Sequence, residues 1–166
     1  MFKIAVRIFN FKTFLLILGY LFFREEGKSF LTYEIKEDSM YPELMSEDYV
    51  IALKKFSSLN RGDIVIYKNE EKGFDVVKRI IGLPGETIST ENGKVLINST
   101  PLESDWSKES TDDFVKTTLN ENQYFVLGDN RKLSTSDSRT LGAINLDKIM
   151  KVKYRYWPLQ RIKTYE

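Results

Sequence analysis

The chain has 166 residues, of which 42% are hydrophobic and 13% aromatic, enough for one compact domain with a core. Its 25 basic and 24 acidic residues give a formal net charge of +1, so no global field indicates nucleic acid or an anionic substrate as a partner. Because the chain contains no cysteine and no histidine, disulfides, zinc-thiolate sites, cysteine nucleophiles, Ser-His-Asp triads and histidine-ligated metals are excluded. Chemistry must use carboxylates, lysines and hydroxyls.

The N-terminal segment combines early positive charge with an apolar run. Residues 13–23 carry no charge, but this run is shorter than the roughly 20 residues that span a bilayer and taken alone fits the apolar part of a secretory signal. No small-x-small pair for cleavage follows it, and extension back to Ile4 gives about 20 residues, with Arg7 and Lys12 able to reach the headgroups. We therefore expect residues 1–28 to be an uncleaved membrane anchor; a helix of a cytosolic protein, amphipathic or buried, is the alternative.

The distribution of positive charge predicts the orientation of this anchor. Lysine and arginine precede the apolar run, so the positive-inside bias places the N-terminus in the cytoplasm. We expect a single-pass protein of the cell membrane, in contact with the lipid bilayer, whose residues 29–166 form one extracytoplasmic domain.

That domain reads as a series of β-strands. Short runs rich in Val, Ile and Tyr alternate with turn signals, which predicts a mainly β fold with an antiparallel sheet. Asn92-Gly93 is a strong signal for a two-residue hairpin. The polar residues 99–122 predict an irregular loop or a reduced insertion. The expected strands are residues 49–55, 63–68, 75–83, 86–90, 94–98, 124–129 and 148–157.

Ser39 lies in the stretch KEDSMYPEL, residues 36–44. A lone serine beside a proline is commonly a turn or capping residue. Tyr33 and Ile35 share its parity, however, so a strand that continued from Tyr33 would bring an apolar-lined groove to the hydroxyl before Pro42 ends it.

Lys78 stands inside the apolar run of residues 75–86, next to Arg79. On a strand these two cations face opposite ways, so one of them points to a buried face, although a strand lysine is commonly exposed. Burial disfavours the charged ammonium, and an unprotonated lysine is a general base that can take the proton of a serine hydroxyl without any imidazole.

A third stretch, residues 126–144, is dense in Gly, Asp, Asn, Arg and Ser. It could be a polar loop with a surface pair between Asp137 and Arg139 that adds little stability. Alternatively, its hydroxyls and this ion pair orient the lysine amine. No carboxylate spacing indicates a metal site, so we expect no metal and no cofactor.

Four short motifs in series resemble the conserved boxes of type I signal peptidases, which are membrane-anchored serine endopeptidases with a Ser-Lys dyad. The likeness covers about residues 33–144. The matching motifs are SMYPEL (39–44), RGDIV (61–65), KRIIGLPG (78–85), and GDNR (128–131) followed by DSR (137–139).

The resemblance implies a role for each matching residue. Ser39 is implied as the nucleophile and Lys78 as the general base. Ser134 matches the serine that hydrogen-bonds the amine, and Asp129, Asp137 and Arg139 support the site. The implied substrates are secretory preproteins with small residues, of the Ala-x-Ala type, before the cleaved bond, bound as an added strand in pockets that Tyr33, Ile35 and Val77 line.

This chain departs from the usual family pattern in three ways. Glu37 replaces a glycine two residues before the nucleophile, where a carboxylate could oppose the developing oxyanion. Glu43 replaces a threonine. The stretch between GDNR and DSR is one residue longer than usual, so counting back from Asp137 gives Thr135 instead of Ser134 as the partner of the amine.

We therefore predict a monomeric signal-peptidase-type enzyme that acts on preproteins and not on nucleic acid. Two alternatives stay open. One is a non-catalytic accessory or chaperone for pilus or surface-protein assembly, which would bind a peptide without cutting it. The other is a cytosolic self-cleaving repressor-type protease, which would need a DNA-binding domain or a cleavable linker in the 38 residues before Ser39.

Overall fold

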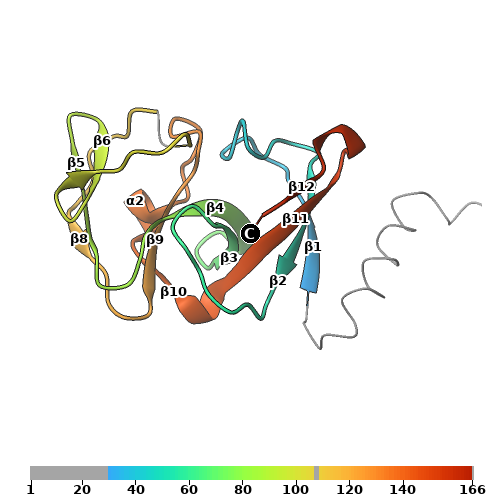
Figure 1. The fold of residues 1–166 in the computed structure, drawn as a ribbon, viewed down its shortest axis with the longest axis horizontal. Helices are drawn as coiled ribbons and strands as arrows, with labels where there is room; N and C mark the ends of the chain where they lie inside the picture. The colour runs from blue at the N-terminus through green and yellow to red at the C-terminus, as the bar shows by residue number, and fades with distance from the viewer. Residues whose placement is uncertain (1–29, 107–108, 166) are drawn as a thin grey trace, which may run out of the picture.

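The structure, a computed structural model, describes residues 30–106 and 109–165. The membrane anchor expected at residues 1–28 lies outside these ranges. Inside them, no helix is long and apolar enough to cross a bilayer. The described residues form two antiparallel sheets (Figure 1), which confirms the predicted mainly β fold.

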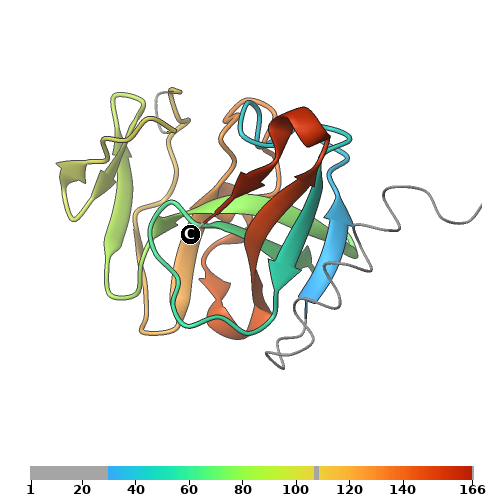
Figure 2. The same ribbon diagram turned by 45° about the vertical axis from the view of Figure 1, so that its right-hand side comes forward.

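The larger sheet has eight strands in the order β1-β2-β11-β3-β4-β9-β10, with β12 paired to β11. β1 is its outermost strand, next to β2 (Figure 2). The long strand β11 pairs with β2, β3 and β12, so it joins segments from both halves of the described chain. The strands are β1 (Phe30–Glu34), β2 (Tyr49–Leu53), β3 (Ile64–Asn69), β4 (Phe74–Gly82), β9 (Gln123–Leu127), β10 (Ile144–Asn145), β11 (Ile149–Trp157) and β12 (Lys163–Thr164).

The smaller sheet, at the left in Figure 1, has four strands in the order β7-β6-β5-β8. Asn92 and Gly93 connect β5 to β6 with φ angles of 52° and 76°, and the flanking residues pair, as in a type I′ turn. The predicted hairpin is therefore confirmed. Residues 99–122 contribute both short strands of this sheet. The bounds are β5 (Thr87–Glu91), β6 (Lys94–Ile97), β7 (Thr100–Pro101) and β8 (Thr117–Thr118).

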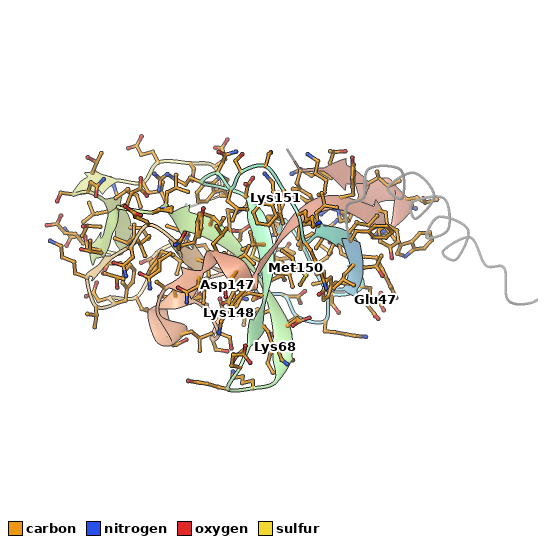
Figure 3. The ribbon with its side chains drawn as sticks, turned by 90° about the horizontal axis from the view of Figure 1, so that it is seen from below. Glu47, Lys68, Asp147, Lys148, Met150 and Lys151 are labelled. Carbon is orange, nitrogen blue, oxygen red and sulfur yellow. The ribbon has the colours of Figure 1, made fainter. Side chains whose placement is uncertain are left out.

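Helical structure in the described residues is limited to single turns. One of them, α2, follows β9 and packs against it. The other two flank β11, the strand on which Met150 and Lys151 lie near the middle of the molecule in Figure 3. These turns are α2 (Ser138–Leu141), η1 (Leu146–Lys148) and η2 (Leu159–Arg161).

Apolar side chains form separate clusters that fix the sheets. One joins the smaller sheet to β9, through residues such as Ile88 and Phe125. Another, which we call the turn core, connects the segment after β1 to β2, β3 and β11. It consists of Ile35, Met40, Leu44, Val50, Ala52, Ile64, Ile66, Val152 and Tyr165.

Candidate active site

Ser39 begins a turn and does not lie on a strand. β1 ends at Glu34, so the strand does not continue to Ser39, the condition under which the sequence pattern would bring the groove to the hydroxyl. The turn closes by backbone hydrogen bonds from Tyr41 N to Asp38 O and from Leu44 N to Met40 O, at 3.1 and 2.9 Å. Met40 and Leu44 are fully buried, and each such side chain contributes about 1.5–3 kcal/mol on burial. The turn core therefore holds the residues on both sides of the hydroxyl.

Lys78, on β4, reaches this hydroxyl. Its Nζ lies 2.8 Å from Ser39 Oγ and donates a second hydrogen bond of 2.8 Å to Val77 O. Both side chains are buried, with exposed fractions of 3% for Lys78 and 4% for Ser39. The next residue, Arg79, is buried as well. Consecutive residues of a strand face opposite sides of the sheet, so both faces of β4 are covered at this point.

The environment of Lys78 favours the neutral amine. Desolvation by burial lowers the pKa of Lys78 from 10.5 to about 8, against the opposing effect of the negative charges of Asp137, Glu37 and Asp129. About one tenth of the amine is therefore unprotonated at pH 7, far more than for an ordinary lysine. In that form Nζ has a lone pair that can accept the proton of Ser39, as a general base requires.

The loop after β9 packs directly against the turn that contains Ser39. Asn130 N donates to Ser39 O at 3.1 Å. A Cβ atom at Gly128 would lie 2.4 Å from Ser134 Oγ and 2.6 Å from Ser39 O, closer than atoms can approach. Glycine is thus required at position 128 because two other segments pass too near for a side chain.

Asp137 organises this loop. It is fully buried, and it accepts hydrogen bonds from Ser134 Oγ at 2.6 Å and from Arg139 Nε and Nη2 at 3.0 and 2.9 Å. Burial alone would raise the pKa of this carboxyl, but the hydrogen bonds of Arg139 and Ser134 lower it below its ordinary value. Asp137 also caps α2 by accepting from Arg139 N. It is therefore a fixed negative charge close enough to act on Lys78.

The structure distinguishes the two candidate hydroxyls. Ser134 is buried, whereas Thr135 is exposed. Among the residues described, the hydrogen bonds of Lys78 Nζ go to Ser39 and Val77, while the hydroxyl of Ser134 donates to Asp137. Ser134 therefore contacts the site indirectly, through its hydrogen bond to Asp137 and its packing against Gly128.

Asp129 pairs with Arg79 in a buried bidentate ion pair. Arg79 Nε and Nη2 lie 2.8 and 2.5 Å from the two carboxylate oxygens, and Arg79 Nη1 donates to Gly62 O at 2.8 Å. Burial raises the pKa of Asp129, although Arg79 opposes this effect. The pair fastens the loop to β4 one residue beyond Lys78, a role for Arg79 that the sequence analysis did not assign.

A groove of about 240 Å³ leads to the Ser39-Lys78 pair. Tyr33, Ile35 and Val77, which the sequence analysis expected in the pockets, all line it. On one side is β1, whose described strand partner is β2; on the other is the start of β4, whose described pairing with β9 begins at Arg79. Two strand edges that pair with no further strand among the described residues therefore border the groove.

Charged side chains also line the groove. Glu34 pairs with Lys36 at 2.9 Å. Asp75 and Tyr33 interact across it, and the pKa of Tyr33 rises to about 12, chiefly through burial and then through the charge of Asp75. Glu37 completes this set and is exposed.

Glu43 connects the turn to the distant C-terminal strands. Lys163 Nζ donates to both of its carboxylate oxygens at 2.9 Å, and Tyr165 OH donates to Oε1 at 2.9 Å. Arg155 and Arg161 donate to the Glu43 carbonyl. We call these five residues the Glu43 clamp. Their separation in the sequence exceeds 100 residues, so no short motif could have indicated the contact.

Elsewhere, the described residues contain no group of three or more His, Cys, Asp or Glu side chains that could hold a metal ion.

Comparison with known proteins identifies the family. The profile of the family described as signal peptidase, peptidase S26, matches residues 7–157. Signal peptidase I P of Bacillus subtilis subsp. natto is 33% identical in an alignment of length 149 that covers 81% of this chain and 80% of that protein. Signal peptidase IB of Staphylococcus aureus (strain COL) is 32% identical in an alignment of length 161 that covers 82% of this chain and 83% of that protein.

A solved structure is similar too. A signal peptidase I from Enterococcus faecalis V583 has a TM-score of 0.52 and 32% identity, in a match that covers 59% of this chain and 98% of that chain. The sequence matches extend over most of the chain, and the motifs noted above meet in one buried site. The chain belongs to the signal peptidase family, peptidase S26.

Proposed function

We propose that this serine endopeptidase removes signal peptides from preproteins through a dyad of Ser39 and Lys78. The observation that supports the dyad is the 2.8 Å contact between Lys78 Nζ and Ser39 Oγ in a buried setting. A serine hydroxyl is a weak nucleophile unless an adjacent base takes its proton, and the neutral amine is a base at bonding distance.

The reaction proceeds by acylation and deacylation. Lys78 Nζ accepts the proton as Ser39 Oγ attacks the carbonyl carbon, and the ammonium then protonates the leaving amine. An ester between Ser39 and the signal peptide remains. Lys78 next deprotonates a water molecule that attacks this ester, and the proton returns to Ser39 Oγ. The backbone N–H of Ser39 is the proposed donor to the developing oxyanion, since the turn core and Asn130 fix that turn.

The groove supports binding of the substrate as an extended strand. The edges of β1 and β4 that pair with no further described strand can pair with a peptide backbone, and strand addition places alternate side chains against the enzyme. Tyr33, Ile35 and Val77 line a groove of only about 240 Å³, and we propose that it takes small residues of the Ala-x-Ala type before the cleaved bond.

The remaining site residues position the dyad. Asp137 and Arg139 hold the loop, Ser134 joins the loop to Asp137, and Asp129 anchors it to β4 through Arg79. The charge of Asp137 also keeps the pKa of Lys78 from falling further. The hydrogen bonds of these residues hold the loop after β9 in place, and none of those described is made to Ser39 Oγ or Lys78 Nζ.

We further propose that the enzyme is a monomer that residues 1–28 anchor in the cell membrane, with the N-terminus in the cytoplasm and the catalytic domain of residues 29–166 outside. The apolar run and the basic residues before it support this topology. Secretory preproteins emerging at that membrane face are then its substrates.

Processing of a preprotein by the full chain in detergent tests the dyad. Ser39→Ala and Lys78→Ala should each reduce kcat by about 10⁴-fold or more, since each removes a partner of the nucleophilic step. Lys148→Ala is the matched control for Lys78→Ala, because Lys148, labelled in Figure 3, is an exposed lysine in η1. It pairs with Glu70 at 3.6 Å. Activity retained in either dyad variant would refute the mechanism, and a wild-type protein that binds the preprotein without cutting it would indicate the accessory function instead.

A further inference from the structure

Glu37 is the one carboxylate of the groove for which the described residues provide no hydrogen bond or ion pair. Glu34 pairs with Lys36, and Asp75 interacts with Tyr33. Asp38, the next residue, accepts a hydrogen bond from Ser46 N at 2.9 Å and does not line the groove. The exposed carboxylate of Glu37 is therefore available to a molecule bound there.

The position of Glu37 places its charge beside the reaction. It precedes Ser39 by two residues, and it lines the same groove as Ser39 and Lys78. Its charge acts on Lys78, whose pKa it raises against the larger effect of burial. A negative charge at this place opposes the negative charge that develops on the carbonyl oxygen during acylation. A positive charge on the substrate would offset this opposition.

No lysine of the described groove pairs with Glu37. Lys36 is paired with Glu34, and Lys78 Nζ is hydrogen-bonded to Ser39 and Val77. Arg79 is held by Asp129 and Gly62. A cation that pairs with Glu37 would therefore come with the substrate.

We propose that Glu37 is a specificity-determining residue that selects preproteins with a lysine or arginine at the second position before the cleaved bond or at the first position after it. This inference rests on the proposed function, because it needs the peptide to lie in the groove. Successive residues of an extended peptide are about 3.3 Å apart, so a glutamate side chain reaches positions within about two residues of the cleaved bond. The proposed function places small residues at the first and third positions before that bond. The basic residue consequently lies at the second position before it or the first position after it.

Cleavage of matched peptides by the full chain tests this proposal. The peptides share small residues at the first and third positions before the cleaved bond and carry Lys, Gln or Glu at either of the two positions named. Wild-type kcat/KM should be about fivefold higher for Lys than for Gln at one of these positions, and lower for Glu, as expected for a partly exposed charge pair. The preference should weaken in 0.5 M NaCl, because salt screens exposed charges.

Substitutions at Glu37 assign the preference to this side chain. Glu37→Gln should abolish it, and Glu37→Lys should reverse it in favour of the peptide with Glu. Glu91→Gln is the matched control, since Glu91 is an exposed glutamate on β5 of the smaller sheet. Equal rates for the Lys, Gln and Glu peptides at both positions, or a preference that survives in Glu37→Gln, would overturn the proposal.

Binding to the Ser39→Ala protein separates this proposal from the proposed function. Titration calorimetry with the same peptides should show the same order of affinity, Lys above Gln above Glu, without any cleavage. If the wild-type protein cuts no peptide but the order of affinity holds and Glu37→Gln removes it, the endopeptidase mechanism fails and the role of Glu37 stands. If peptides are cut and bound without regard to charge, the role of Glu37 fails and the mechanism stands.

Discussion

Replacing Lys78 by methionine should make the protein more stable while it destroys activity. Burial lowers the pKa of this amine from 10.5 to about 8, and each pH unit of lowering corresponds to about 1.4 kcal/mol. The charged form therefore costs the folded state about 3 kcal/mol at pH 7. Methionine has a similar length and no charge, but it loses the hydrogen bonds to Ser39 and Val77, worth about 1 kcal/mol each. We expect a net gain of about 1 kcal/mol at pH 7.

The pH dependence of this gain identifies its cause. Because the folded-state pKa is lower than the unfolded one, the unfolded chain binds more protons between pH 8 and 10.5, and the stability of the wild type rises with pH in that window. The cost of the charge is complete below pH 8 and is relieved as pH increases towards 10.5. The stability difference between variant and wild type should therefore shift by about 2 kcal/mol in favour of the wild type from pH 7 to pH 10.

Urea unfolding of the full chain in detergent, followed by circular dichroism at both pH values, measures these differences. Lys151→Met is the control. Lys151 is a buried lysine of β11 that pairs with Asp63 at 2.8 Å, so its replacement leaves a buried carboxylate uncompensated and should destabilise by about 3 kcal/mol. If Lys78→Met destabilised the fold as much as this control, with no change between pH 7 and 10, the desolvated amine would be the wrong explanation.

Three further predictions concern the site. The kcat/KM of the wild type should rise about tenfold per pH unit below pH 8 and level off above it, because only the neutral amine of Lys78 is a base; a flat profile from pH 6 to 9 would contradict this. Gly128→Ala should lower kcat more than tenfold and destabilise by about 1–3 kcal/mol, since the methyl group meets Ser39 O and Ser134, and unchanged kinetics and unfolding would refute that crowding. Glu43→Lys should unfold at lower urea concentration than wild type, and adding Lys163→Glu should restore part of the loss; no recovery in the double variant would argue against the Glu43 clamp.

Local sequence patterns predicted most of the strands and the hairpin because these features depend on neighbouring residues. Asn92-Gly93 adopts the positive φ angles that such a turn requires, and the runs of Val, Ile and Tyr are strands within a few residues of the expected bounds. The alternation that begins at Tyr33 would allow a strand as far as Ser39, but β1 ends at Glu34. Alternation alone cannot show that the chain leaves the sheet after Glu34, because Ile35 is buried outside a strand as well.

The contact between Lys78 and Ser39 could be predicted for a different reason. A charged residue inside an apolar run and a hydroxyl beside a proline are ambiguous separately, and only their combination with the other motifs indicated one site. The pair of Asp137 with Arg139 could be predicted because the two residues are close in sequence, but the partner of Asp129 could not. An ion pair such as Arg79-Asp129 depends on which strand edges meet, and β4 meets β9 through contacts across 50 residues of sequence.

The Glu43 clamp links the turn that contains Ser39 to the last strands of the chain. Its side chains follow Glu43 by 112 to 122 residues. Until β11 and β12 have folded, the turn lacks these contacts. If Ser39 is the nucleophile proposed above, we therefore expect proteolytic activity to appear only after the C-terminal strands are in place.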